Sequence, residues 1–215
     1  MTVRVKICGV NSRAALAAAL AGGASHVGFV FYGPSPRALE AAAAAALAAT
    51  VPANVTRVGL TVDETDGRIA ALLAAVPLDM LQLHGDETPE RVDELRRRFG
   101  LPVMKAIRVA GAADVAAAAS YGGVADWLLF DALPPRDMAG ALPGGNALAF
   151  DWRLIAGRRW PCPWMLSGGL NAGNLAAAVA ATGATVVDVS SGVEDRPGVK
   201  NPAKIAAFLA LAASL

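Results

Sequence analysis

The chain alternates between short apolar runs and longer segments that are rich in alanine or in charge. A short apolar run bounded by turn residues is typical of a buried β-strand. The pattern predicts eight such strands: Val3–Ile7, His26–Phe31, Thr56–Thr61, Met80–Leu83, Val103–Ile107, Trp127–Phe130, Trp164–Leu166 and Val186–Val189.

The segments between these runs have the end signals of helices. Thr88 and Pro89 offer an N-cap and a first helical residue, and Gly100 is a typical residue just past a helix end. Asn201 and Pro202 open the last helix in the same way. Alanine-rich runs predict three more helices, at Ala14–Ala21, Ala41–Ala49 and Ala176–Ala181. Four acidic residues are interpreted as favourable charge at a helix start: Asp86, Glu87, Glu90 and Asp93.

Strands that alternate with helices predict a parallel sheet. Eight such units favour an α/β fold of the closed (β/α)₈ barrel type, a single domain over residues 1–215. An open doubly wound sheet is the alternative, and it is disfavoured because no glycine-rich dinucleotide motif follows the first strand. The Pro- and Gly-rich segment Ala132–Ala149 is predicted to be a long active-site loop rather than a domain linker.

Alternation within the first and last strands predicts which side chains enter the barrel. Arg4, Lys6 and Cys8 lie on the opposite face from three apolar residues, so we expect them to point inward. The same reasoning turns Asp188 and Ser190 inward. Because the first and last strands are neighbours in a closed barrel, Lys6 and Asp188 are expected to pair.

Composition narrows the function classes. The 215 residues are 55% hydrophobic with a formal net charge of +1, which gives no basic surface for nucleic acid or anionic membranes. Residues 161–187 carry no charge but are broken by proline and glycine, so no membrane span is expected. Residues 1–7 lack the features of a secretory signal, and a cytoplasmic location is expected.

The cysteines and histidines predict neither a disulfide nor a metal site. Cys8 ends the first strand, whereas Cys162 precedes the seventh at the opposite rim, out of bridging distance. The chain has two histidines, His26 and His84, and His26 begins a strand. Neither the cysteines nor the histidines have metal-ligand spacing, so no metal is expected.

Cys8 and Asp131 are the candidate catalytic residues. Each follows an apolar strand, and the carboxyl ends of barrel strands are where catalytic groups gather. Cys8 is alternatively a small buried core residue. To act as a base its thiol needs a cationic neighbour, which Lys6 could supply. Asp131 is alternatively an N-cap, but the long loop after it favours a functional carboxyl, which burial would equip as a general acid.

Glycine-rich loops follow the seventh and eighth predicted strands. Glycine lets backbone N–H groups approach an anion, and these two loops are where barrels often bind phosphate. Each loop taken alone is also compatible with an ordinary turn. We assign substrate binding to this group and to the inward-facing carboxyl at the end of the last strand: Gly168, Gly169, Asp188, Ser190, Ser191 and Gly192.

Arg37 and His84 complete the candidate substrate-binding residues. Arg37 follows the second strand in a loop stiffened by two prolines, where its guanidinium could bind a carboxylate with two hydrogen bonds. The alternative is a solvated surface arginine. His84 follows the fourth strand and either covers the site or caps a turn.

Several motifs, in this order, resemble phosphoribosylanthranilate isomerase over essentially the whole chain. They are Lys6-Ile7-Cys8-Gly9, Gly28-Phe29-Val30-Phe31 with Ser35-Pro36-Arg37, Gln82-Leu83-His84-Gly85, Lys105-Ala106-Ile107, Phe150-Asp151-Trp152, Gly168-Gly169-Leu170-Asn171 and Val187-Asp188-Val189-Ser190-Ser191-Gly192-Val193-Glu194. The resemblance implies a single (β/α)₈ barrel of tryptophan biosynthesis that acts without metal or organic cofactor. Its partner is a small phosphorylated substrate, and the protein is expected to be a monomer or homodimer.

The resemblance also implies a reaction and a role for each residue. The reaction is the Amadori rearrangement of N-(5-phosphoribosyl)anthranilate, in which Asp131 protonates the ribose ring oxygen and Cys8 removes the proton from C2. Arg37 matches the position that binds the anthranilate carboxylate, and the two glycine loops match the phosphate site. Two departures occur: Gly144-Gly145-Asn146-Ala147 replaces the usual Gly-Gly-Thr-Gly, and Asn11 replaces the usual Thr, Lys or Arg.

Two other functions remain open. One is another phosphate-binding barrel isomerase, such as the histidine-pathway sugar isomerase, which typically uses two aspartates where this chain has Cys8 and Asp131. The other is a catalytically silent barrel that binds a phosphorylated metabolite and regulates a partner. Such a protein would keep the glycine loops and lose the acid or the base.

Overall fold

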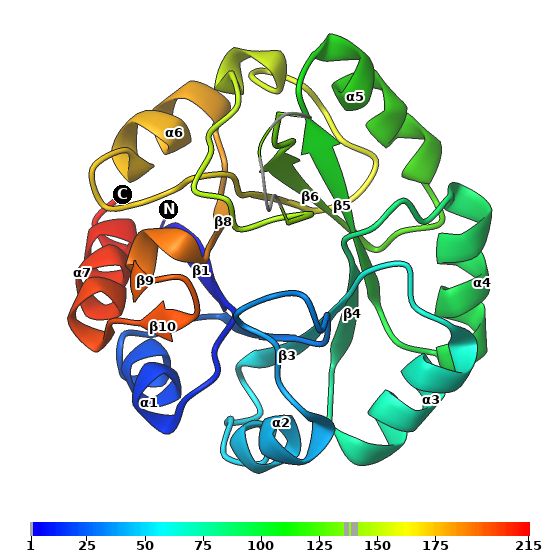
Figure 1. Ribbon diagram of the computed structural model, residues 1–215. Helices are drawn as coiled ribbons and strands as arrows, with labels where there is room; N and C mark the ends of the chain where they lie inside the picture. Colours follow the sequence, from blue (N-terminus) through cyan, green and yellow to red (C-terminus); the bar gives the residue numbers. More distant parts are fainter. Residues whose placement is uncertain (1, 136–137, 139–141) are drawn as a thin grey trace.

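The computed structural model describes residues 2–135, 138 and 142–215. Eight parallel strands pair in chain order and close into a barrel, which confirms the predicted fold class (Figure 1). The strands are β1 (Arg4–Cys8), β2 (His26–Val30), β3 (Thr56–Thr61), β4 (Met80–Leu83), β5 (Val103–Val109), β6 (Trp127–Ala132), β7 (Trp164–Leu166) and β8 (Val186–Val189).

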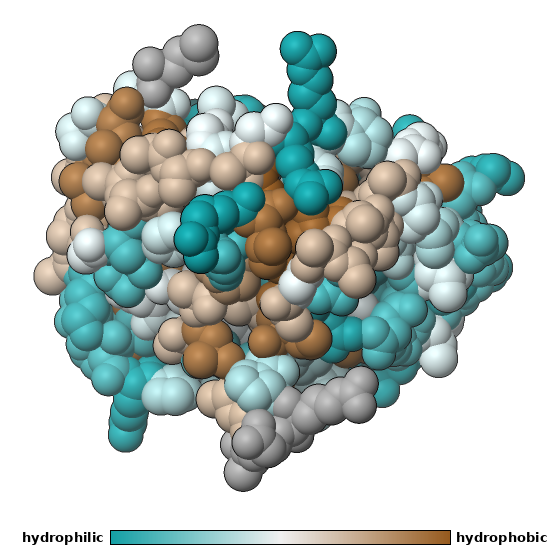
Figure 2. All heavy atoms as spheres, turned by 90° about the horizontal axis from the view of Figure 1, so that it is seen from above, coloured by the Kyte–Doolittle hydropathy of each residue, from teal (hydrophilic) through white to brown (hydrophobic). Residues whose placement is uncertain are grey.

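Helices form an outer ring around the strands (Figure 1). They are α1 (Arg13–Ala21), α2 (Ala41–Ala48), α3 (Asp66–Ala75), α4 (Pro89–Phe99), α5 (Ala112–Ala117), α6 (Leu175–Thr182) and α7 (Pro202–Ala213), with 3₁₀ helices η1 (Ala118–Tyr121), η2 (Trp152–Leu154) and η3 (Ser191–Val193). Within the described ranges, no helix has the length and apolarity needed to cross a membrane. The flank on the side of α5 and α6 exposes apolar surface between hydrophilic projections (Figure 2).

Two helices begin and end as their sequence signals predict. The Thr88 side chain accepts a hydrogen bond from a backbone N–H in the first turn of α4, and Pro89 is the first residue. Gly100 ends α4 in the left-handed conformation, with φ of 64°, which glycine adopts at little cost. Asn201 caps α7 by accepting two backbone N–H bonds, and Pro202 follows it.

The strand ends differ from the predicted bounds at functionally relevant places. β1 extends through Cys8, and β6 extends through Asp131 to Ala132, so both candidate catalytic residues lie within strands. A small antiparallel hairpin of β9 (Glu194–Arg196) and β10 (Val199–Lys200) follows η3 and has no counterpart in the predicted elements. Residues 136–137 and 139–141 of the predicted loop Ala132–Ala149 lie outside the described residues.

Alternation separates an apolar region between strands and helices from smaller apolar clusters inside the barrel. The region between strands and helices includes Val5, Ile7 and Val187, on the face opposite to Lys6 and Asp188. A smaller cluster inside the barrel contains Met80 and Leu129. Packing in both regions fixes the strands that carry the site.

The predicted ion pair across the barrel seam is present. β1 and β8 pair in a register that places Lys6 opposite Asp188, and Lys6 Nζ donates to Asp188 Oδ1 at 2.9 Å. Burial lowers the pKa of Lys6, but the charges of Asp188 and Cys8 outweigh burial, so the net pKa is raised. Lys6 is fully buried, and its charge is therefore compensated by a partner rather than by water.

Glu87 corrects one interpretation of the sequence. It is 6% exposed and forms an ion pair with Lys105, whose Nζ lies 2.9 Å from Glu87 Oε2. Its carboxylate also accepts hydrogen bonds from the backbone N–H groups of Asp63 and Gly85. Glu87 therefore connects Asp63, Gly85 and Lys105 at the carboxyl ends of the strands, in addition to providing charge near the start of α4.

Candidate active site

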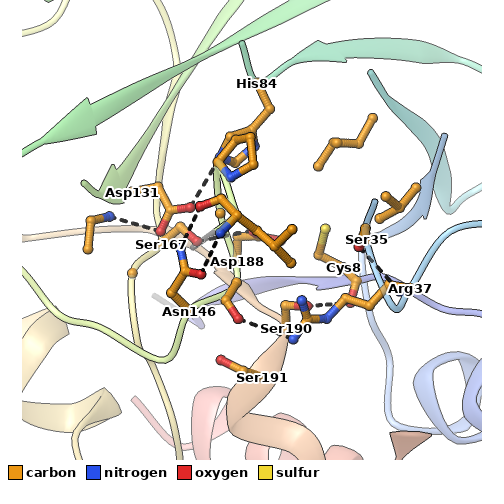
Figure 3. Close-up of a pocket in the computed structure, with 18 of the residues that line it drawn as sticks. Cys8, Ser35, Arg37, His84, Asp131, Asn146, Ser167, Asp188, Ser190 and Ser191 are labelled. Carbon is orange, nitrogen blue, oxygen red and sulfur yellow. Dashed lines mark hydrogen bonds and ion pairs between the residues drawn. The ribbon is translucent and has the colours of Figure 1, made fainter. Parts of the chain in front are cut away.

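A pocket with an empty volume of about 710 Å³ opens at the carboxyl ends of the strands. This position is typical of small-molecule sites in barrel enzymes. The candidate residues that line it come from six strand ends (Figure 3): Cys8, Arg37, His84, Asp131, Gly168, Gly169, Asp188, Ser190 and Ser191. Gly192 does not line the pocket; it packs against Leu170, whose carbonyl oxygen leaves no room for an added Cβ.

Cys8 is the last residue of β1 and is 6% exposed. Burial raises the pKa of its thiol, because a thiolate loses hydration there. The charges of Lys6 and Lys200 act in the opposite direction, and Asp188 adds to the rise. Lys6 thus favours the thiolate as expected, but burial outweighs it and the thiol is the resting form at neutral pH.

Asp131 projects into the pocket from β6 and is 5% exposed. Its Oδ1 accepts a hydrogen bond from the backbone N–H of Ala132 at 2.9 Å. Its Oδ2 lies 3.2 Å from Nε2 of His84, which comes from the end of β4 (Figure 3). His84 therefore contacts the candidate acid and lines the pocket.

Arg37 is held by a buried carboxylate rather than solvated. Its Nε and Nη2 each donate to Glu194 at 2.8 Å, and Arg37 is 4% exposed. Lys200 Nζ also donates to Glu194, at 2.7 Å. Burial raises the pKa of Glu194, but the hydrogen bonds and charges of Arg37 and Lys200 outweigh burial and the net pKa is lowered.

Glu194 and Lys200 are site-supporting residues that sequence reasoning did not identify. Glu194 stands in the stretch Ser190–Glu194, and its position directly after a glycine loop was the available signal. No residue near Lys200 in the sequence indicates that its side chain contacts Glu194, the carboxylate that pairs with Arg37. The β9–β10 hairpin places Lys200 opposite Glu194 and so brings the two side chains into contact.

The glycine loop after β7 can accept an anion. Gly168 and Gly169 have φ of 87° and 61°, and an added Cβ at Gly169 would lie 2.6 Å from the backbone of Leu148. Both positions therefore require glycine. Within residues 2–135, 138 and 142–215, the N–H groups of Gly168 and Gly169 donate to no acceptor. Ser190 and Ser191 line the pocket from the neighbouring loop after β8.

The segment Leu142–Leu148 covers one side of the pocket. Asn146 closes it into a turn by hydrogen-bonding the N–H and C=O of Leu142 at 3.0 and 2.7 Å. An added Cβ at Gly144 would lie 2.6 Å from His84 Nε2 and 2.7 Å from Asp131 Oδ2. The backbone of Gly144 therefore lies directly over the contact between the histidine and the aspartate.

The pocket combines a thiol, a carboxyl group, a fixed guanidinium and a glycine-rich anion site. Among the residues that the structure describes, no group of three His, Cys, Asp or Glu side chains is arranged to hold a metal ion. Both cysteines are free thiols. A closed barrel with a carboxyl group, a thiol and glycine-rich loops at the carboxyl ends of its strands is typical of the class of (β/α)₈-barrel enzymes that bind phosphorylated substrates.

Comparison with known proteins identifies the family. The family model "N-(5'phosphoribosyl)anthranilate (PRA) isomerase" matches residues 5–210. The chain is 62% identical to N-(5'-phosphoribosyl)anthranilate isomerase of Rhodospirillum centenum over 215 residues, covering 100% of both chains. It is 58% identical to the Cereibacter sphaeroides enzyme, covering 96% of this chain and 97% of the relative.

Solved structures of the same family have the same fold as this chain. The phosphoribosyl anthranilate isomerase of Thermotoga maritima superimposes with a TM-score of 0.87 at 35% identity, covering 99% of this chain and 100% of the other. A phosphoribosyl anthranilate isomerase in complex with reduced 1-(o-carboxyphenylamino)-1-deoxyribulose 5-phosphate gives 0.85 at 34% identity, with the same coverage. The chain belongs to the N-(5'-phosphoribosyl)anthranilate isomerase family of tryptophan biosynthesis, and the resemblance expected from its motifs is confirmed.

Proposed function

We propose that this isomerase converts N-(5-phosphoribosyl)anthranilate to 1-(2-carboxyphenylamino)-1-deoxyribulose 5-phosphate, with Asp131 as general acid and Cys8 as general base. The observation that carries the assignment is that both residues are buried in one pocket with the glycine loops after β7 and β8. The solved relative that is bound to the reduced form of this product supports the choice of substrate.

In the first step Asp131 protonates the ribose ring oxygen, and the ring opens to a Schiff base. Cys8, as thiolate, then removes the proton from C2, and the resulting enolamine tautomerises to the ketone. The acid and the base come from β6 and β1, so they can act on different atoms of one bound sugar.

Deprotonation of Cys8 is the step that the site must assist. Burial raises the pKa of the thiol, while Lys6 and Lys200 lower it. We expect the rate to rise with pH as the thiolate fraction increases, because only the thiolate accepts the C2 proton.

The rest of the pocket binds the two ends of the substrate. Nε and Nη2 of Arg37 are held by Glu194 and by the carbonyl oxygen of Gly145, so the N–H groups of Nη1 are left for the anthranilate carboxylate. Gly168, Gly169 and Ser191 bind the phosphate, and this remote contact positions the reacting sugar. The proposal includes a cytoplasmic protein that acts as a monomer or homodimer; the relative described as dimeric supports the latter.

The test is a coupled fluorescence assay in which the unstable substrate is generated in place. Decay of its emission is compared with spontaneous breakdown, and the product is identified chemically. Cys8→Ser and Asp131→Asn are each expected to lower kcat about 100-fold or more. Cys162→Ser is the matched control, because that thiol is half-buried and does not line the pocket.

Each outcome has a distinct meaning. Unchanged turnover in Cys8→Ser would remove Cys8 as the base and leave it a core residue. If folded wild-type protein yields no product, the histidine-pathway substrate or a silent phosphate-binding role replaces the proposal.

A further inference from the structure

A buried row of three side chains ends on the carboxyl group of Asp131. Gln82 Nε2 lies 2.8 Å from His84 Nδ1, and His84 Nε2 lies 3.2 Å from Asp131 Oδ2. The three residues are 0%, 4% and 5% exposed, so water does not compete for these contacts. Gln82 and His84 point inward together because they are two residues apart along an extended strand.

The amide of Gln82 determines which imidazole nitrogen carries the proton. The structure turns the amide nitrogen of Gln82 toward His84 and leaves its Oε1 buried without a partner among the described residues, so in this orientation the nitrogen donates and Nδ1 of His84 accepts. The proton of the neutral imidazole is then on Nε2. From there it is donated to Oδ2 of Asp131, while Ala132 N–H donates to Oδ1.

We propose that Gln82 is a positioning residue for the isomerisation: it holds His84 in the Nε2–H tautomer, which donates to the Asp131 carboxylate as that group releases its proton. The inference rests on the proposed role of Asp131 as general acid. It goes beyond that role by stating what receives the negative charge when the acid acts.

The proton-transfer step shows where the charge goes. The O–H bond of Asp131 breaks and an O–H bond forms at the ribose ring oxygen. The bond from C1 to the ring oxygen breaks with its electron pair on oxygen, and the nitrogen lone pair forms the C=N bond. The carboxylate left behind then accepts two N–H bonds, from Ala132 and from His84. These bonds strengthen as the charge develops, which is how a preorganised site favours a transition state.

Among the residues that the structure describes, the other charged groups near Asp131 are already paired. Lys6 is paired with Asp188, which also accepts from Ser167 at 3.2 Å. At the mouth of the barrel, Arg108 from β5 is paired with Asp86. Gly144 covers the contact from the loop side and contributes no charge. The imidazole is therefore the side-chain donor placed to respond when Asp131 changes its charge.

Nuclear magnetic resonance of the ring nitrogens tests the tautomer directly. The chain has two histidines, so His26→Gln assigns the signals of His84 without ambiguity. We expect the nitrogen shifts and two-bond couplings of wild-type His84 to report the Nε2–H form near neutral pH. An Nδ1–H form in the wild type would overturn the proposal, because Gln82 would then be accepting rather than donating. This readout requires no isomerase activity.

Two variants connect the tautomer to catalysis. Gln82→Met keeps the side-chain length and removes the hydrogen bond, whereas Gln82→Glu presents only acceptors and favours a proton on Nδ1. Each is expected to shift the His84 signals and to lower kcat about 10- to 100-fold with little change in KM. In Gln82→Met the Nδ1–H tautomer of His84 becomes accessible, and in that tautomer Nε2 no longer donates to Asp131.

Met80→Leu is the matched control, since Met80 lies on the same strand and face two residues before Gln82. It is expected to leave the His84 tautomer and the pH profile unchanged. Wild-type kinetics in both Gln82 variants, with the His84 signals shifted, would refute the positioning role. Absence of isomerase activity in the wild type, with the Nε2–H form present, would refute the proposed function instead.

Discussion

Burial of His26 is expected to make the free energy of unfolding depend on pH. His26 begins β2, points into the bottom of the barrel and is 5% exposed. Burial lowers the pKa of His26 from 6.5 to about 4, and the positive charges of Lys6 and Arg4 add to the effect. Its Nδ1 lies 2.9 Å from Ser25 Oγ, so the neutral ring keeps a hydrogen-bond partner.

Acid is expected to lower the free energy of unfolding, because the unfolded state binds more protons than the folded protein. Between pH 6.5 and about 4 the unfolded chain protonates His26 and the folded protein does not, so the unfolded state binds more protons. The stabilisation is present above pH 6.5 and is lost as pH falls through this window. The full shift corresponds to about 3 kcal/mol in the free energy of unfolding, and about 2 kcal/mol of it is lost between about pH 7.5 and pH 5.

Denaturant unfolding of the wild type and of His26→Gln at these two pH values provides the assay. Carboxylates also lose stabilisation in acid, so the quantity of interest is the difference between the two proteins. We expect the wild type to lose about 2 kcal/mol more than the variant on acidification. Parallel losses in both proteins would refute the burial argument for His26.

Three further changes test the packing around the pocket. Glu194→Gln leaves Arg37 and Lys200 buried without their counter-charge. It is expected to lower the free energy of unfolding by about 3 kcal/mol and to raise KM. Asp195→Asn, at an exposed neighbouring position, is the control. Gly144→Ala places a methyl group 2.6 Å from His84 Nε2 and is expected to lower kcat about 10-fold or more. Gly111→Ala is the control and is expected to leave kcat unchanged, because an added Cβ there would have no neighbour within 4 Å. Ala147→Gly relieves a φ of 59° and is expected to raise the unfolding free energy by about 1 kcal/mol, measured by denaturant unfolding; a loss of stability would contradict the strain argument.

Local patterns predicted the scaffold because their causes are local. The bounds of β3, β4, β7 and β8 match the apolar runs, since a buried strand needs a continuous apolar segment. The caps at Thr88 and Asn201 also match, because a cap depends on a few neighbouring residues. The pairing of Lys6 with Asp188 was predictable as well, because barrel closure brings β1 and β8 together.

The missed features depend on contacts between distant segments. Arg37 and Glu194 are 157 residues apart, and nothing near either residue indicates the other. The sequence around Glu87 indicates only a charge near a helix start, whereas in the folded protein Glu87 is buried and paired with Lys105. In each case a charged side chain leaves water only because another segment supplies its partner.

The sequence by itself determined the barrel, the family and the residue types at the strand ends, because periodicity, caps and motifs are properties of neighbouring residues. Only the tertiary structure decided the state of those residues. Burial raises the pKa of Cys8 despite the nearby Lys6, and the row from Gln82 to Asp131 assigns a proton to His84. Desolvation and hydrogen-bond direction depend on everything that surrounds a side chain, and those surroundings exist only in the folded protein.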